Sequence, residues 1–124
     1  MKVVIVDDDP AVVRMLSRLL SSRGHEVHEC GSPFGVSAVI LRELPDLVVL
    51  DVMMPGLDGR NLAEVITRLP LSQPPRIVFW SATAEDQLRE IGRQTGLPVF
   101  SKATSPTQVV QKLEELIQGK DSRS

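Results

Sequence analysis

Residues 3–9 read Val-Val-Ile-Val-Asp-Asp-Asp, four β-branched apolar residues followed directly by three carboxylates. The same pattern, a short apolar run ended by a polar residue, returns at 47–50 before Asp51 and at 77–80 before Ser81. Continuous apolar runs of this length are typical of strands that are buried on both faces, as in a parallel sheet. These three segments therefore predict the central strands of such a sheet.

Two more polar segments, 26–30 and 99–101, suit the edge strands of the sheet, where one side of a strand meets water. Helical periodicity separates the strands, clearly within 12–20, 62–69 and 109–117 and less regularly within 34–44 and 85–94. Helix starts are predicted where a capping residue precedes proline, at Asp9-Pro10, Ser32-Pro33 and Ser105-Pro106. Helix ends are predicted at Gly24 and Gly119. Five strand–helix alternations indicate an α/β domain, a parallel sheet covered by helices on both faces.

The length of 124 residues, with 42% hydrophobic and 24% charged residues, is that of one globular domain. We assign residues 1–118 to this domain and residues 119–124 to a C-terminal tail or a cut linker. The net charge of −2 offers no overall positive field for nucleic acid or an anionic membrane, so this domain is expected to bind neither directly. Because Cys30 has no partner for an internal disulfide and the first apolar run is too short for a signal peptide, we expect a cytoplasmic protein.

Carboxylates stand at the ends of two predicted central strands. Ligands of open parallel sheets bind beyond the carboxyl ends of the strands. If strands 3–6 and 47–50 are neighbours, Asp7, Asp8 and Asp51 converge on one small volume. Two carboxylates about 4 Å apart repel by about 4 kcal/mol at an effective dielectric constant near 20, which implies a bound cation. An all-oxygen ligand set without Cys or His points to Mg²⁺.

A hydroxyl and an amine follow two other strands. Ser81 comes directly after 77–80, and Lys102 comes directly after 99–101. A lysine ammonium suits one oxygen of a phosphoryl group, and a serine hydroxyl can donate a hydrogen bond to another. Carboxylate, metal ion, lysine and hydroxyl are together the parts needed to form an aspartyl phosphate.

The fragments 5–9, 50–59 and 81–82 and Lys102, in this order at the strand ends, resemble the receiver domain of bacterial two-component response regulators. The resemblance extends over residues 2–118 and implies a flavodoxin-like fold with the strand order 2-1-3-4-5. It also implies a histidine kinase or a histidine phosphotransfer protein as the phosphoryl donor. An unknown downstream effector would bind the face formed by the fourth helix, the fifth strand and the fifth helix.

The resemblance implies roles for the acidic residues and one backbone group. Asp51 would accept the phosphoryl group from a phosphohistidine. Asp8 and Asp51 would bind Mg²⁺ directly, together with the backbone carbonyl of Met53, and Asp7 would act on the ion largely through water. On this interpretation the chain catalyses at most its own phosphoryl transfer and autodephosphorylation, not the turnover of an external substrate.

The resemblance also implies that Lys102 pairs with the phosphoryl group and that Ser81 turns inward to form a hydrogen bond with it. This movement would change the conformation of the effector-binding face.

Two departures from the family pattern affect this region. Ala103 stands where the family has a proline after a cis peptide bond, and because a cis bond before a non-proline residue costs about 2.5 to 4 kcal/mol, we predict a trans bond and a shifted loop. Val99 replaces the family's switch aromatic, and Phe100 is expected to point to the other face of the strand.

Two alternative functions remain open on the sequence. The first is a haloacid-dehalogenase-type phosphatase with Asp7 as nucleophile and Asp9 as acid/base, although Ala11 departs from the pattern of such enzymes. The second is a binding-only receiver that is never phosphorylated, against which the complete set of strand-end residues argues.

Several candidate residues also have structural roles that need no ligand. We interpret His25 and His28 as solvated edge-strand residues and Trp80 as a core residue. We expect Met53 and Met54 to shape access to the site. Helix-capping roles are predicted for Asp9, for Asp58 and for Thr83 with Asp86.

Overall fold

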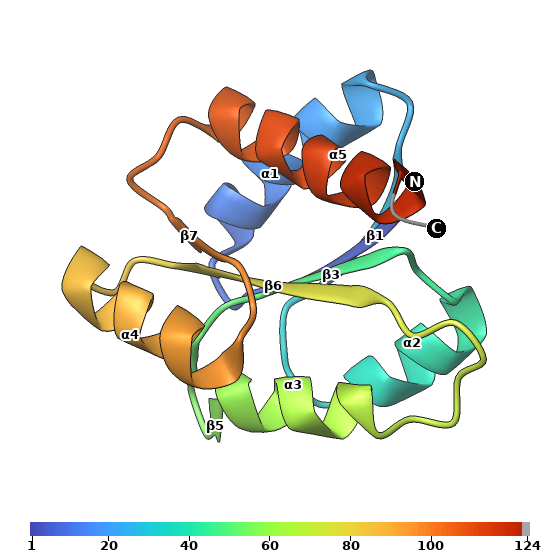
Figure 1. The fold of residues 1–124 in the computed structure, drawn as a ribbon, viewed down its shortest axis with the longest axis horizontal. Coiled ribbons are helices and arrows are strands. Elements are labelled where there is room, and N and C mark those ends of the chain that lie inside the picture. Colours follow the sequence, from blue (N-terminus) through green and yellow to red (C-terminus); the bar gives the residue numbers. More distant parts are fainter. Residues whose placement is uncertain (123–124) are drawn as a thin grey trace.

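The computed structural model describes the backbone of residues 1–122 and the side chains of residues 1–118. A five-stranded parallel sheet forms its centre, in the order β2-β1-β3-β6-β7 (Figure 1). In that order the strands are Glu26–Cys30, Lys2–Val6, Leu47–Leu50, Arg76–Ser81 and Val99–Ser101. The helices α1 to α5 are Pro10–Ser22, Val36–Glu43, Gly59–Thr67, Glu85–Thr95 and Pro106–Ser122. A short antiparallel hairpin follows β3 and consists of β4, Met53–Met54, and β5, Leu57–Asp58.

Helices cover both faces of the sheet, with α1 and α5 on one face and α2, α3 and α4 on the other (Figure 1). Successive residues of β3 point to opposite faces. Leu47 and Val49 pack into the core under α1 and α5, whereas Val48 and Leu50 pack into the core on the other side. All four are at most 1% exposed. A strand buried on both faces needs apolar residues at every position, which explains the continuous apolar runs.

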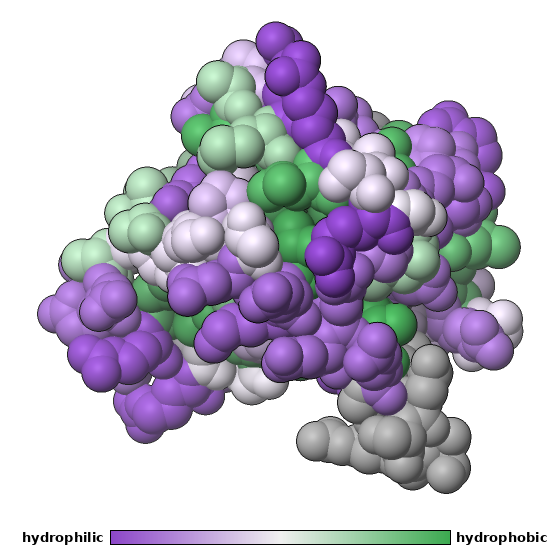
Figure 2. Space-filling model, turned by 90° about the horizontal axis from the view of Figure 1, so that it is seen from above, coloured by the Kyte–Doolittle hydropathy of each residue, from purple (hydrophilic) through white to green (hydrophobic). Residues whose placement is uncertain are grey.

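The outer surface over α1 and α5 is mainly hydrophilic, with small apolar areas between the polar side chains (Figure 2). This matches the amphipathic pattern of the two helices, whose apolar residues face the sheet. Leu16 and Leu113, for example, are both fully buried in the core beneath this surface.

The predicted strands and their order 2-1-3-4-5 are confirmed, with the two more polar strands at the edges of the sheet. The predicted start of α1 is also confirmed, because the Asp9 side chain accepts hydrogen bonds from the backbone N–H groups of Ala11 and Val12. At the other end, Gly24 follows the last turn of α1 with φ +89°. This left-handed conformation favours glycine and ends the helix where the sequence predicts.

The predicted start of α2 at Ser32-Pro33 is wrong. The helix begins at Val36, after Gly35 in a left-handed conformation with φ 80°. Ser32 Oγ accepts a hydrogen bond from Phe34 N–H at 3.2 Å, which forms a local turn instead of a helix cap. A serine side chain serves either structure, and the left-handed Gly35 separates this turn from the helix.

The predicted end of α5 at Gly119 is wrong as well, because the helix continues to Ser122. None of the residues after Gly119 is a proline, so nothing in the sequence forces the chain out of a helix there. The last residues of the predicted tail, 123–124, lie outside the described residues. No helix in the described part of the chain combines the length and the apolar character needed to cross a membrane.

Candidate functional site

Three carboxylates meet at the carboxyl edge of the sheet. The hydrogen-bond ladder continues one residue past β1 and β3, since Asp7 N–H donates to Cys30 O at 3.1 Å and Asp51 N–H donates to Val6 O at 3.0 Å. Adjacent strands therefore place Asp7 and Asp51 side by side. Together with Asp8 they bring carboxylate oxygens within 4.8 Å of one another. Asp7 and Asp51 are 1% and 6% exposed, whereas Asp8 is open to solvent.

Lys102 brings one positive charge to this cluster. Its N–H donates to Ser81 O at 2.8 Å, which fixes the start of the loop after β7. Its Nζ lies 2.6 Å from Asp7 Oδ2 and 3.5 Å from Asp51 Oδ2. Burial alone lowers the pKa of Lys102, but the close contact with Asp7 and the negative charges of Asp7 and Asp51 outweigh burial, so that the pKa is raised. Lys102 is therefore a charged ammonium in this site.

The cluster has the charge and the ligand atoms for a divalent cation. Burial raises the pKa of Asp51 above its usual value, and the charge of Asp7 is the second largest cause of this shift. Lys102 and the Met53 N–H act in the opposite direction but do not cancel it. Asp7 Oδ2 contacts Lys102 Nζ but accepts no well-directed hydrogen bond, so it has unused lone pairs. Three carboxylates against one ammonium leave an excess of two negative charges. A hard divalent ion with oxygen ligands, such as Mg²⁺, fits this arrangement.

The loop from Asp51 to Gly59 holds the Asp51 carboxylate in place. Met53 N–H donates to Asp51 Oδ1 at 3.3 Å, and Gly56, with φ +80°, makes the tight turn of the β4–β5 hairpin. Gly59, the first residue of α3, lies against the backbone of Asp51. A Cβ atom at this position would come within 2.2 Å of Asp51 O. Only glycine fits there, and sequence reasoning missed this role because no local signal distinguishes close packing from an ordinary turn glycine.

Asp58 has the capping role that the sequence predicts, but the expectation that both methionines shape access to the site is wrong for Met54, which packs in the core. Met53 is 69% exposed beside Asp51, whereas Met54 is buried. Asp58 caps α3, because its Oδ1 accepts a hydrogen bond from Arg60 N–H at 2.8 Å. It also pairs with the Arg60 guanidinium and takes no part in the carboxylate cluster.

Ser81 is 1% exposed at the end of β6, and its hydroxyl bonds within its own loop. Ser81 Oγ lies 2.8 Å from Thr83 Oγ1 and accepts a hydrogen bond from Thr83 N–H. The predicted capping box of Thr83 with Asp86 is wrong. The cap position of α4 is Ala84, without a side-chain hydrogen bond, and the Asp86 carboxylate instead accepts from Gln87 N–H. Thr83 does not cap the helix because α4 begins at Glu85, which puts the cap position one residue after Thr83.

The two departures from the expected pattern lie on either side of Lys102: Val99 is the first residue of β7, and Ala103 is in the loop that follows it. The predicted trans bond between Lys102 and Ala103 is confirmed, since the described chain contains no cis peptide bond. Ser101 holds the loop, because its Oγ accepts a hydrogen bond from Ala103 N–H and its carbonyl accepts one from Thr104 N–H. Val99 and Phe100 pack into opposite cores, as the sequence predicts.

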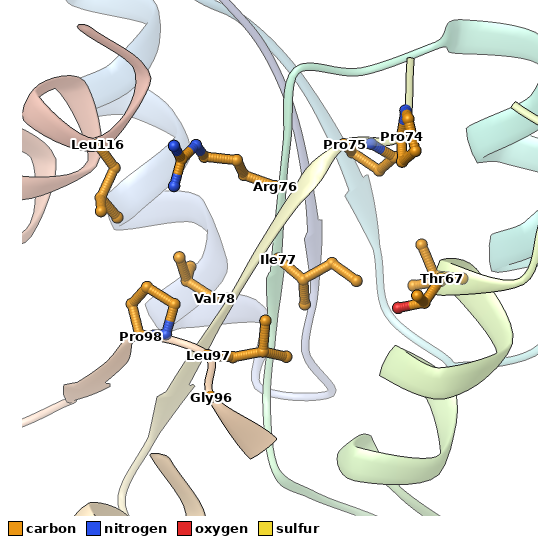
Figure 3. A pocket seen from close by; sticks show the side chains of 11 residues that line it. Thr67, Pro74, Pro75, Arg76, Ile77, Val78, Gly96, Leu97, Pro98 and Leu116 are labelled. Carbon is orange, nitrogen blue, oxygen red and sulfur yellow. The ribbon is translucent and has the colours of Figure 1, made fainter. Parts of the chain in front are cut away.

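The pocket in Figure 3 lies at the opposite edge of the sheet, where β6 and β7 begin. Its lining is mainly apolar and includes Pro74, Pro98 and Leu116, with Arg76 as the charged side chain. None of the predicted site residues lines it. The carboxylate cluster and Lys102 therefore lie at the other edge of the sheet, away from this pocket.

Comparisons with known proteins agree with this geometry. A family model described as the response regulator receiver domain matches residues 3–114. The phosphate regulon transcriptional regulatory protein PhoB of Pseudomonas aeruginosa is 30% identical over 116 residues, which cover 93% of this chain and 51% of PhoB. The chain thus spans about half the length of this relative.

Solved structures give the same result. The BeF3-activated N-terminal receiver domain of RstA from Klebsiella pneumoniae superposes with a TM-score of 0.82 at 28% identity, over 94% of this chain and 98% of that one. The receiver domain of the putative response regulator NarL from Mycobacterium tuberculosis has a TM-score of 0.79 at 29% identity, over 95% and 96%. Fold, acidic cluster and family match agree, and the chain belongs to the response regulator receiver domain family of two-component signal transduction.

Proposed function

We propose that this chain is a phosphorylation-controlled switch in which Asp51 accepts a phosphoryl group from a phosphohistidine. The donor is a histidine kinase or a histidine phosphotransfer protein. The observation that carries the proposal is the meeting of Asp7, Asp8 and Asp51 with Lys102 at one edge of the sheet. Of the two buried carboxylates, Asp51 is the more exposed, at 6% against 1% for Asp7, and the side chain of nearby Met53 is exposed.

The residues divide the chemistry among them. An Asp51 oxygen forms a bond to phosphorus while the bond between phosphorus and the donor's histidine nitrogen breaks, and the histidine leaves as a neutral imidazole after protonation. Asp8, Asp51 and the Met53 carbonyl would hold Mg²⁺, with Asp7 acting on it through water, and the ion would supply charge neutralisation for the phosphoryl oxygens. Lys102 gives up part of its contact with Asp7 to pair with a phosphoryl oxygen.

The switch lies in the loop after β6. Ser81 Oγ is bonded to Thr83 in the structure, and a phosphoryl group on Asp51 offers it a stronger, charged acceptor. If Ser81 leaves Thr83 for this acceptor, the loop before α4 changes, and so does the face of α4, β7 and α5 that an effector binds.

The phosphatase alternative loses its acid/base residue. Asp9 caps α1 with its side chain, and the chain belongs to the receiver family. The binding-only alternative is decided by experiment.

Intact mass after incubation with Mg²⁺ and acetyl phosphate tests the proposal. We expect the mass of one added phosphoryl group in the wild-type protein and in Asp86→Asn, an exposed acidic residue outside the cluster. The adduct should be absent from Asp51→Asn and in the presence of a chelator. An adduct that persists in Asp51→Asn overturns the assignment. If wild type shows no adduct, and no stable beryllofluoride complex despite bound Mg²⁺, the chain is a binding-only receiver.

A further inference from the structure

We infer that Trp80 is a positioning residue for the phosphoryl-transfer site, which holds the Lys102 ammonium over the face of its indole ring. The inference rests on the proposed function of Asp51 and deepens it. Lys102 Nζ lies 5.4 Å from the centroid of the Trp80 ring, within the range of a cation–π interaction. The same ammonium contacts Asp7 and Asp51, so the ring lies against a cation that pairs with the carboxylate cluster.

The sheet brings the two residues together. Trp80 in β6 pairs with Phe100 in β7, and one residue further the Lys102 N–H donates to Ser81 O. Trp80 is 2% exposed and packs in the core beneath α1 and α5. The same lysine ammonium that contacts Asp7 lies over this buried ring. Its position thus depends on a rigid side chain that the sheet itself holds.

The indole nitrogen shows which property of the ring matters. Trp80 Nε1 is buried and has no hydrogen-bond partner, so the polar end of the side chain is unused. A leucine would fill core space without burying an unpaired N–H group. What an apolar residue cannot supply is the electron-rich face of the ring, which attracts an ammonium most strongly in tryptophan and less in phenylalanine.

This contact has a consequence for the reaction. A lysine side chain has many rotamers, and holding it in one of them costs conformational entropy at each turnover unless the protein has already restricted it. With the ring in place, Lys102 stays at the site when it shifts from Asp7 to an incoming phosphoryl oxygen. Without the ring, Mg²⁺ still has its carboxylates, but the ammonium is less often in position.

Phosphorylation rates of Trp80→Phe and Trp80→Leu test the inference, with Phe79→Leu as the matched control. Phe79 is fully buried, adjacent in β6, and packs in the opposite core. With acetyl phosphate and saturating Mg²⁺, we expect Trp80→Leu to react roughly 3- to 30-fold more slowly than wild type, Trp80→Phe to be intermediate, and Phe79→Leu to keep the wild-type rate. Mg²⁺ affinity from calorimetry should be unchanged in both Trp80 variants. An unchanged rate in Trp80→Leu, or an equal loss in Phe79→Leu, overturns the inference.

A second measurement does not need phosphorylation. Protons above the face of an aromatic ring resonate upfield, so the ε-methylene protons of Lys102 should show such a shift in wild type. Lys102→Met identifies the signal by its loss, and Trp80→Leu should return it to the ordinary lysine position. Absence of the shift in wild type overturns the inference. Its presence in a protein that takes no phosphoryl group would instead show that the proposed function has failed while the contact is real.

Discussion

At the residue scale, the Asp51 carboxylate lies in a balance of opposing influences. Burial and the charge of Asp7 disfavour its ionised form, while Lys102 and the N–H of Met53 favour it. The net effect raises the pKa of Asp51. The ionised carboxylate is therefore energetically unfavourable in the folded protein at the point where an incoming phosphoryl group binds. A divalent cation or a phosphoryl group paired with Lys102 relieves this cost, which couples the chemistry of one residue to the stability of the fold.

We predict that Asp51→Asn stabilises the metal-free protein at neutral pH. Because folding raises the pKa of Asp51, the protonated form contributes stability below the pKa of the unfolded chain, and this stability is lost as the pH rises through the folded pKa. The neutral asparagine avoids this loss, so the free energy of unfolding of the metal-free variant at pH 7 should exceed that of the wild type. Urea unfolding with a chelator, from acidic to neutral pH, measures it. A gain that persists undiminished at acidic pH would contradict this explanation.

We predict that Gly59→Ala disturbs the site through the backbone. The added Cβ atom would overlap with Asp51 O, and relief requires movement of the loop that holds Asp51. Overpacking of this kind typically costs about 1 to 3 kcal/mol, and the phosphorylation rate should fall with it. Gly31→Ala is the control, since its Cβ atom would meet nothing within 4 Å. Equal effects of the two substitutions on the rate would refute the role of Gly59.

At the element scale, short sequence patterns predicted those helix and strand features that depend on residues close together in the chain. The start of α1 was predictable because Asp9 bonds to N–H groups two and three residues ahead. The environment of His25 was not, and its interpretation as solvated is wrong. Its side chain is only 14% exposed, because Nε2 lies 2.7 Å from Glu114, 89 residues further along. A contact at such separation depends on how α5 packs beside α1, which no short pattern reveals.

We predict that Glu114→Gln loosens the packing of α5. Hydrogen bonds from Arg23 and His25 lower the pKa of Glu114 to about 2, so its charged form contributes stability above the ordinary glutamate pKa and loses it as the pH falls towards 2. Because Glu114 is partly exposed, the loss in the variant at neutral pH should be at most about 1 kcal/mol. Denaturation of Glu114→Gln and of the exposed neighbour Glu115→Gln at pH 7 and pH 3 measures it. A deficit that does not shrink at pH 3, or that Glu115→Gln shares, speaks against the ion pair.

At the scale of the whole molecule, the fold concentrates its charged chemistry at one edge of an otherwise apolar sheet. The strands, their order and the meeting of Asp7 with Asp51 were predictable, since strand ends define the edge once the order is known. The partners of each side chain were not predictable. That the Lys102 ammonium lies closer to Asp7 than to Asp51, and that Ser81 bonds to Thr83, depends on loop geometry that the apolar pattern does not encode.

We predict that Mg²⁺ stabilises the whole domain through this edge. A ligand that binds only the folded state adds about 2.7 kcal/mol at a hundredfold excess over its Kd. The thermal midpoint of the wild type should therefore rise with Mg²⁺, and the rise should be lost in Asp8→Asn. Glu26→Gln is the control, because the second acidic group, Glu26 with His28 and Glu43, already has the Lys2 ammonium 3.6 Å from both glutamates. A rise that survives in Asp8→Asn, or disappears in Glu26→Gln, would place the ion elsewhere.

The central claim is that Asp51 carries the phosphoryl group, and mapping the modified residue tests it most directly. After reaction with acetyl phosphate and Mg²⁺, borohydride reduces an aspartyl phosphate to homoserine, and the mass of the resulting peptides locates the change. We expect homoserine at position 51 alone, and none when a chelator is present. Modification at Asp7 or Asp8 instead, or an adduct that borohydride leaves intact, would contradict the account.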